Sequence, residues 1–298
     1  MLDKAEKAYR LLQMHERLSR GESVVKADAL AAFGIPSKTF QRDIDSLRLY
    51  YAELEGGELF YDRKENCYRL IAQSYKLTKQ EIYAICKVLI ESRAFNQEEF
   101  DLIIEKLLQQ CDQTERKAVK SLIANEQVNY IPLQHGKLLV DVLWELSACI
   151  TGQHIIQFDY QRIDGMIRHH EVKPVGIMFS EFYFYLITFM ADDRQKFPTV
   201  FRVDRIRELT RLDMRFRVPY VERFSEAEFR KRVQFMYPGE LRRLRFLYKG
   251  NLEAVLDRLP TAQVEAQNDD GTIIRAEAYG DGIDMWLRSQ GERVEMIE

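Results

Sequence analysis

The sequence contains no apolar run long enough to cross a membrane. Its most apolar stretch, Phe179 to Met190, is interrupted by Glu181 and falls short of the roughly 20 residues that a membrane-spanning helix needs. The first 20 residues are charged throughout, so we expect no signal peptide. Together these absences predict a cytoplasmic protein.

Cysteine and histidine are also scarce, with 4 and 5 residues in the chain. Cys67, Cys86, Cys111 and Cys149 lack the paired spacing of a disulfide framework or a zinc knuckle, so we interpret them as small, partly buried residues. The only histidine pair is adjacent, and adjacent side chains on a strand face opposite ways. We therefore expect neither a metal nor a cofactor.

Charge does not by itself indicate a nucleic-acid partner. The net charge of the 298 residues is −3, residues 1–70 carry 12 basic and 12 acidic side chains, and residues 251–298 carry 4 basic and 11 acidic ones. A chain of this length predicts two or three domains. Any DNA-binding role must therefore rest on local patterns.

Such a local pattern lies in residues 1–72. Helices fit residues 3–18 and 25–33, and Gly34 and Pro36 then form a turn before a helix from Ser37 to Arg48, for which Ser37 is a suitable N-cap. Phe40, Ile44 and Leu47 lie on one face of this helix, which predicts that they are buried. The opposite face carries side chains that can contact base edges and phosphates, namely Ser37, Lys38, Thr39, Gln41 and Arg42.

Two alternating segments, 58–62 and 67–70, predict a β-hairpin with Arg63 and Lys64 at its tip, placed to contact DNA phosphates. The stretch S-K-T-F-Q-R-D-I-D-S-L-R resembles the S-x-R-T-x-x-R-D-x-x-x-L pattern of DeoR-type winged helices, with Lys38 in place of the usual arginine. The resemblance implies a winged helix-turn-helix that binds double-stranded DNA. We expect Asp43 to form a structural pair or cap instead of a DNA contact.

Residues 73–150 predict a helical connector. Thr78 and Glu81 have the spacing of a capping box, and further helices fit residues 98–110 and 136–150. A dimerising role for this segment is plausible, because a helix-turn-helix usually binds two half-sites.

From residue 153 the apolar period changes to two, and residues 151–215 predict a small β-barrel of short antiparallel strands. The segments that carry a resemblance to the WYL domain are Phe158–Tyr160, Gly165, His170–Pro174, Phe184–Leu186 and Phe201–Ile206. That resemblance implies an Sm-like or SH3-like barrel. Phe184 replaces the tryptophan of the family's name, and His170 replaces an arginine.

The same resemblance implies that the barrel senses a ligand, either an anionic nucleotide or a nucleic acid. The candidate ligand-binding residues are Tyr160, Arg168, His170, Tyr185, Arg202 and Arg205. Arg202 and Arg205 face one pocket only if a bulge or turn separates them. Two alternatives remain: Arg205 pairs structurally with Asp204 or Glu208, and Tyr185 is a core residue.

Residues 216–298 predict a small α+β domain, in the order strand, helix, strand, helix, strand. The stretch from Trp286 to Gly291 resembles the C-terminal extension that follows many WYL domains. This C-terminal domain is expected to close the ligand site or complete a dimer.

The predicted fold class is therefore α+β: an all-helical winged helix-turn-helix with its hairpin wing (1–72), a helical connector (73–150), a barrel (151–215) and an α+β extension (216–298). We expect a ligand-responsive transcriptional regulator that acts as a homodimer. One alternative is an enzyme carrying a DNA-binding module, against which the sequence shows no nucleophile elbow, phosphate loop or H-E-x-x-H motif. Another alternative is a nucleic-acid sensor whose barrel binds single strands.

Overall fold

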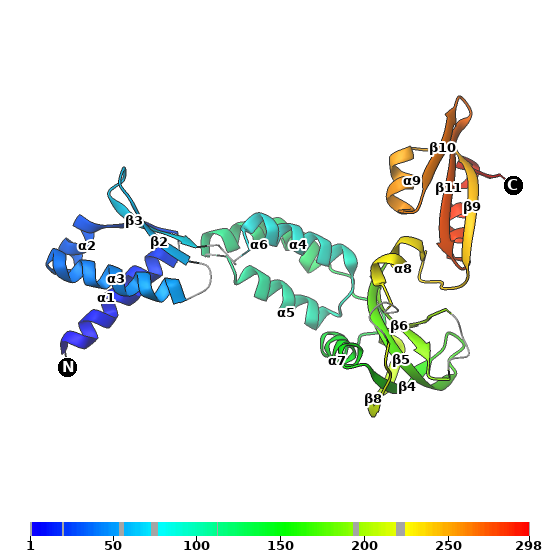
Figure 1. The fold of residues 1–298 in the computed structure, drawn as a ribbon, viewed down its shortest axis with the longest axis horizontal. Helices are drawn as coiled ribbons and strands as arrows, with labels where there is room; N and C mark the ends of the chain where they lie inside the picture. The colour runs from blue at the N-terminus through cyan, green and yellow to red at the C-terminus, as the bar shows by residue number, and fades with distance from the viewer. Residues whose placement is uncertain are drawn as a thin grey trace. The chain divides into compact units, whose positions relative to one another are not determined.

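The structure is a computed structural model that describes residues 2–19, 21–53, 57–72, 77–111, 113–192, 197–218 and 224–297 (Figure 1). The chain divides into two compact units, residues 1–81 and 82–298, which we describe separately. None of the described helices is long and apolar enough to span a membrane. The division into four parts that the sequence suggests stays a prediction.

The first unit combines three helices with a three-stranded antiparallel sheet. Its elements are α1 (Leu2–Ser19), β1 (Val24–Val25), α2 (Lys26–Phe33), α3 (Ser37–Glu53), β2 (Gly57–Asp62) and β3 (Cys67–Ala72), and the strand order is β1-β3-β2. Phe40 and Ile44 are fully buried against Met14 of α1 and Tyr68 of β3, as the apolar period of α3 predicts. The expectation of an all-helical module is wrong, because Val24 and Val25 pair with Tyr68 and Cys67 and extend the hairpin into a sheet.

The turn between α2 and α3 shows where helix α3 begins. Gly34 ends α2 with φ 60°, a left-handed conformation that glycine adopts without strain. The carbonyl of Pro36 accepts hydrogen bonds from the amides of Thr39 (2.9 Å) and Phe40 (3.2 Å). Ser37 is therefore the first helical residue, and the prediction that it caps the helix is wrong, because the carbonyl of Pro36 already accepts the first helical bond.

The capping box predicted near the start of the connector is confirmed. The Thr78 amide donates to Glu81 Oε2 at 2.7 Å, and the Glu81 amide donates to Thr78 Oγ1 at 3.2 Å. These bonds from Thr78 lower the pKa of Glu81. Helix α4 (Lys79–Ser92) follows directly, so this boundary is set by its own local residues.

Two more helices and α7 complete the helical part of the second unit. They are α5 (Gln97–Leu108), α6 (Gln113–Val128) and α7 (Val140–Thr151). The sequence did not predict α6, whose buried residues are only Val119 and Ile123. Helix α7 begins four residues later than expected, after Gly136 turns the chain with φ 61°.

The middle of the second unit is a five-stranded antiparallel sheet with α7 packed on it. Its strands are β4 (His154–Gln161), β5 (Ile167–Ser180), β6 (Tyr183–Met190), β7 (Thr199–Arg202) and β8 (Ile206–Arg215), in the order β7-β6-β5-β4-β8. Phe158 and Leu186 pack against Leu146 of α7 to form its core.

This sheet does not close into the predicted Sm-like or SH3-like barrel. Within the described residues, β7 pairs only with β6 and β8 pairs only with β4. Strand β7 has four residues, and a 3-10 turn (Val203–Arg205) then leads the chain to the far edge, so no ladder joins the two edge strands. The described strands form an open sheet, so the predicted Sm-like or SH3-like barrel is not confirmed.

The C-terminal part contains a second antiparallel sheet in the order β10-β11-β9-β12. Its elements are α8 (Glu226–Arg232), β9 (Leu241–Tyr248), α9 (Leu252–Arg258), β10 (Gln263–Asn268), β11 (Gly271–Tyr279), α10 (Gly282–Ser289) and β12 (Val294–Met296). Phe246, Ile274, Ile283 and Trp286 lie in its core. The sequence missed β10, all of whose residues are exposed, so it lacks the half-buried alternation of a typical strand.

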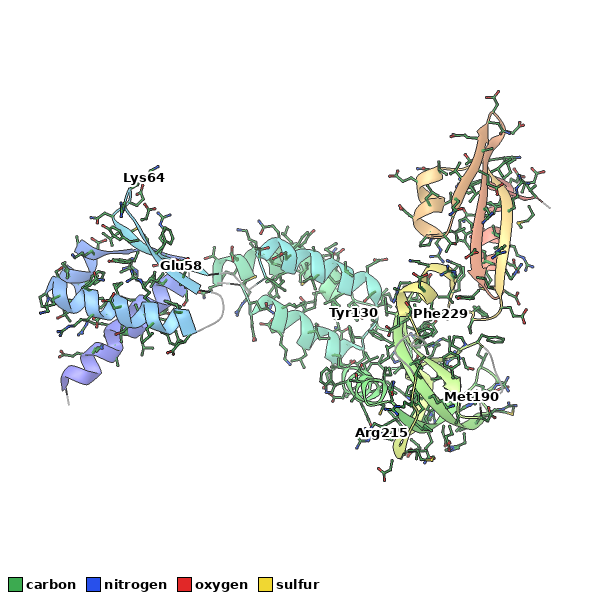
Figure 2. All side chains as sticks on the ribbon, viewed as in Figure 1. Glu58, Lys64, Tyr130, Met190, Arg215 and Phe229 are labelled. Carbon is green, nitrogen blue, oxygen red and sulfur yellow. The ribbon has the colours of Figure 1, made fainter. Side chains whose placement is uncertain are left out.

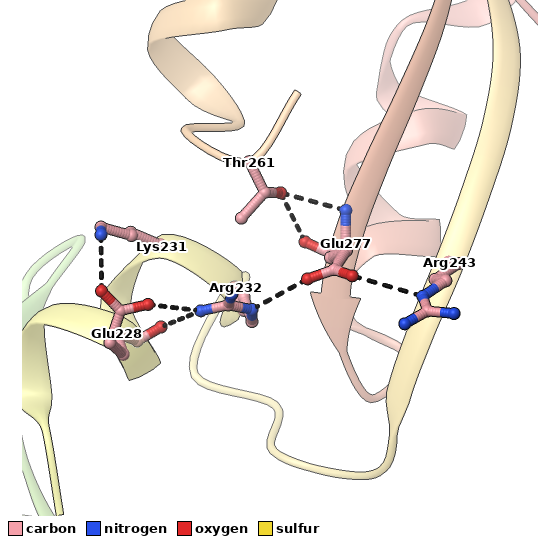
Figure 3. A network of polar contacts seen from close by, with 6 residues as sticks. All are labelled: Glu228, Lys231, Arg232, Arg243, Thr261 and Glu277. Carbon is pink, nitrogen blue, oxygen red and sulfur yellow. Dashed lines mark hydrogen bonds and ion pairs between the residues drawn. The ribbon is translucent and has the colours of Figure 1, made fainter. Parts of the chain in front are cut away.

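Helix α8 contacts both sheets of the second unit. Phe229 packs with Met178 and Ile187 of the five-stranded sheet. On the other side, Arg232 joins Glu228 of its own helix (2.8 Å) to Glu277 of β11 (3.3 Å), as Figure 3 shows. Arg243 of β9 also donates to Glu277, so α8 is tied to the C-terminal sheet through one shared carboxylate.

Candidate functional site

The exposed face of α3 carries the residues predicted to contact DNA. Ser37, Lys38, Gln41 and Arg42 are exposed, and Thr39 is half-buried. The buried Phe40 and Ile44 hold the other face of the helix in the core. Local helical geometry therefore presents these polar groups together.

Gln41 is held in place by two neighbours. Its Nε2 donates to Asp45 Oδ1 at 3.1 Å, and its Oε1 accepts from the Tyr68 hydroxyl at 3.4 Å. Arg48 also donates to Asp45 at 3.1 Å. The bonds to Asp45 and Tyr68 fix the direction of the Gln41 amide, and its second N–H remains available for a base contact.

Asp43 lies on the buried side of α3 and pairs with a cation. Its Oδ2 accepts from Arg10 Nε at 3.0 Å, and the two residues are 1% and 8% exposed. The prediction that Asp43 forms a structural pair is confirmed. This ion pair joins α1 to the helix that presents the polar face.

The hairpin predicted beside α3 is confirmed, and Arg63 and Lys64 are exposed in its tip (Lys64 in Figure 2). Asp62 Oδ1 accepts from the backbone amides of Lys64 (2.9 Å) and Glu65 (3.3 Å), which fixes the turn. Asn66 takes φ 51°, a left-handed conformation that asparagine tolerates. Arg63 and Lys64 thus lie in a turn whose backbone is fixed by hydrogen bonds.

In the five-stranded sheet, Tyr160, Tyr185 and Arg202 come together. The Tyr160 hydroxyl accepts from the Arg202 backbone amide at 3.2 Å. Tyr185 of β6 lies directly opposite Arg202 of β7 in the ladder. Burial raises the pKa of the Tyr185 hydroxyl, so this half-buried group remains a neutral donor.

The Arg202 guanidinium is engaged on two sides. It donates to both oxygens of Asp204, at 3.0 and 2.8 Å, and lies 3.4 Å from the ring centroid of Tyr183. Its side chain is 20% exposed. Burial opposes its charge, but the bonds to Asp204 outweigh that effect and raise its pKa. An anion that binds here would contact the partly desolvated Arg202 guanidinium, which is already paired with the Asp204 carboxylate.

The remaining predicted ligand-binding residues surround this group less closely. The half-buried Arg205 is the last residue of the 3-10 turn that follows Arg202, so a turn intervenes, as is needed for both arginines to face one pocket. Arg168 is exposed and lies opposite Tyr160. The His170 ring packs against Phe201 in a tilted arrangement, with 4.8 Å between ring centroids, and burial lowers the pKa of His170. Asp204 pairs with Arg202, so the expected alternative pairing of Asp204 with Arg205 is wrong.

Sequence reasoning missed Tyr183 and Asp204, although each lies two residues from a predicted one. On a strand, residues two apart share a face, which was the available signal for Tyr183. His135 and Lys137, from the loop before α7, also approach the turn at Asp204, and no pattern in the sequence indicates this contact. Among the described residues, no group of three potential ligands gathers to hold a metal ion.

Comparison with known proteins gives one family match. A family model of the WYL domain matches residues 141–211, which span α7 and most of the five-stranded sheet. No curated protein matches the chain. The WYL-domain resemblance seen in the sequence is thus confirmed for this segment.

Two solved structures are similar at low scores. Proteasome accessory factor B/C (PafBC) of Arthrobacter aurescens is 18% identical with a TM-score of 0.31, and the match covers 99% of this chain and 44% of that one. A CRISPR Cas-related protein is 12% identical with a TM-score of 0.37, covering 87% and 66%. The chain thus spans less than half of the first relative, and neither likeness carries an argument about function.

Proposed function

We propose that this chain is a transcriptional regulator that binds double-stranded DNA through α3 and the β2–β3 hairpin, and responds to an anionic ligand in its WYL domain. The observation that carries the proposal is the exposed face of α3 with Lys38 and Arg42, held outward by the buried Phe40 and Ile44. In this reading the first unit is a winged helix-turn-helix of the DeoR type. The chain acts by binding and is not an enzyme.

Lys38 and Arg42 stand four residues apart, so they lie on one side of α3. The major groove of B-DNA admits a helix, and an arginine there can make a bidentate contact with guanine. Arg63 and Lys64 reach phosphates from the hairpin tip. Because residues 1–70 carry equal numbers of acidic and basic side chains, affinity depends on these few groups and on a second copy in a homodimer that binds two half-sites.

On the ligand side, an anion such as a nucleotide or a short single strand exchanges with Asp204 for the guanidinium of Arg202. Arginine binds phosphate through paired hydrogen bonds, and aromatic rings such as Tyr183 and Tyr160 offer stacking faces for a base. With the anion bound, Arg202 contacts the anion, and in the free protein it contacts Asp204. This difference in contacts can shift the fraction of molecules that are in the DNA-binding conformation.

A thermal-shift measurement with three probes tests the ligand site: sulfate, cyclic AMP and a five-nucleotide oligothymidylate. A probe present at about 100 times its Kd stabilises the wild type by about 2.7 kcal/mol. Arg202→Ala is expected to lose most of this shift. The matched control is Arg207→Ala, an exposed arginine of β8, which keeps it. Equal ligand-induced thermal shifts in the wild type and in Arg202→Ala would show that Arg202 does not bind the ligand.

A further inference from the structure

The loop between α6 and α7 is bonded to the turn that carries Asp204. Lys137 Nζ donates to the carbonyl of Ile206 at 3.0 Å, directly after the 3-10 turn. Leu139 packs in one buried cluster with Val203 and Ile206. The loop that contains His135 therefore packs directly against the turn that carries Asp204, and a displacement of that turn moves the loop.

Glu99 of α5 holds the same end of this loop, where α7 begins. Its Oε1 accepts from the amides of Leu139 (2.7 Å) and Val140 (2.8 Å), at the start of α7. Glu99 is 7% exposed, and within the described residues its Oε2 is buried without a hydrogen-bond partner. The loop thus connects the helical connector to the five-stranded sheet.

His135 is half-buried in this loop, and one of its ring nitrogens has no partner among the described residues. Its Nδ1 accepts from the Lys137 amide at 3.1 Å, so the neutral ring carries its proton on Nε2. Nε2 is buried and has no partner among the described residues. The charged groups that face His135 are Asp204, Arg202, Lys137 and Glu99, and burial is the main effect that lowers its pKa, so the ring is neutral in the free protein.

Asp204 is itself 7% exposed, and both of its oxygens bind Arg202. An anion that takes the guanidinium leaves this carboxylate buried without its cation, which is strongly unfavourable. His135 is a half-buried residue that lies close enough to interact with the Asp204 charge; its buried Nε2–H has no partner among the described residues, and its ring can gain a charge.

We propose that His135 takes up a proton when an anion binds Arg202, and that this uptake transmits ligand binding to the connector. The inference rests on the proposed function. One proton from solvent binds His135 Nδ1, while Nε2–H donates to the carboxylate that Arg202 has released. The anion then neutralises Arg202, and the imidazolium neutralises Asp204.

Protonation of Nδ1 also breaks its bond from the Lys137 amide, because a protonated nitrogen accepts no hydrogen bond. The end of the loop that Glu99 and Ile206 hold, next to His135, must then rearrange. Since the bound state carries one more proton than the free state, anion binding strengthens as pH falls, by up to about tenfold per pH unit until His135 is protonated in the free protein too.

Isothermal titration calorimetry in two buffers of different ionisation enthalpy measures this uptake directly. The full chain is titrated near neutral pH with the same three probes, none of which titrates between about pH 5.5 and 8. We expect the binding heat of the wild type to depend on the buffer, with a slope approaching one proton per anion. His135→Gln is expected to bind with no such slope, and the control His169→Gln, an exposed histidine paired with Asp159, keeps it.

Asp204→Asn is a second variant in case His135→Gln does not fold. This substitution removes the buried negative charge that stabilises the protonated His135, so the variant is expected to bind a probe without taking up a proton. Binding by the wild type without buffer dependence overturns the inference and leaves the proposed function intact. Uptake that persists in His135→Gln or Asp204→Asn places the proton elsewhere, for example on His170, and also overturns it. Failure of all three probes to bind overturns both proposals.

Discussion

Replacing Asp43 by alanine is expected to lower the free energy of unfolding of the first unit by about 3–5 kcal/mol. Asp43 and Arg10 are both buried and 3.0 Å apart, so the variant leaves the Arg10 guanidinium in the core without its counter-charge. That cost exceeds the value of the ion pair itself, because the desolvation of Arg10 is no longer compensated.

Asp45→Ala is the matched control on the same helix. Asp45 also pairs with an arginine, Arg48 at 3.1 Å, but both side chains are about half exposed, so the loss is expected to stay below about 1 kcal/mol. Both tryptophans, Trp144 and Trp286, lie in the second unit, so their fluorescence does not report on this change. Amide hydrogen exchange of α3 peptides does, and similar losses in the two variants would contradict the account.

The second large effect concerns DNA binding. Replacing both Lys38 and Arg42 by alanine is expected to weaken binding about 100-fold or more, because each base contact of this kind contributes about 1–3 kcal/mol. Fluorescence anisotropy with a labelled duplex measures the loss. If one of the two side chains contacts a phosphate instead, its removal lowers the slope of log K against log salt by about one.

Lys7→Ala serves as the control, since Lys7 is exposed on α1 and lies outside the proposed DNA-binding face. Its duplex affinity is expected to remain within about threefold of the wild type, the change that a long-range loss of one screened charge allows. Neither variant is expected to unfold the first unit, because Lys38 and Arg42 are exposed. Equal affinities of the double variant and the control would remove α3 from the interface.

Features set by neighbouring residues could be predicted from the sequence. The capping box at Thr78 and Glu81 depends on residues three apart, and it is present as expected. The burial of Phe40 and Ile44 follows from the helical period, and the four cysteines are buried more completely than the partial burial that the sequence predicts. The local period likewise placed the polar residues of α3 on its exposed face.

Features set by distant residues could not be predicted. Strand β8 pairs with β4 and not with β7, so the sheet stays open, and nothing in either segment specifies that choice. The engagement of Arg202 by Asp204 and Tyr183 depends on the turn after β7 and on packing from β6. The approach of Lys137 to Ile206 joins residues 69 positions apart. Such contacts follow from tertiary packing, which overrides local pattern.

The central claim is that one chain binds DNA and that an anion in its WYL domain changes that binding. The direct test is anisotropy of the full chain, at low salt, on a duplex from the region upstream of its own gene, with and without the anion that gives the largest thermal shift. The account predicts saturable binding whose affinity changes about 5–150-fold with the anion, and no such change in Arg202→Ala. Absence of binding to any upstream duplex at low salt, or an affinity that the anion leaves unchanged, would contradict it.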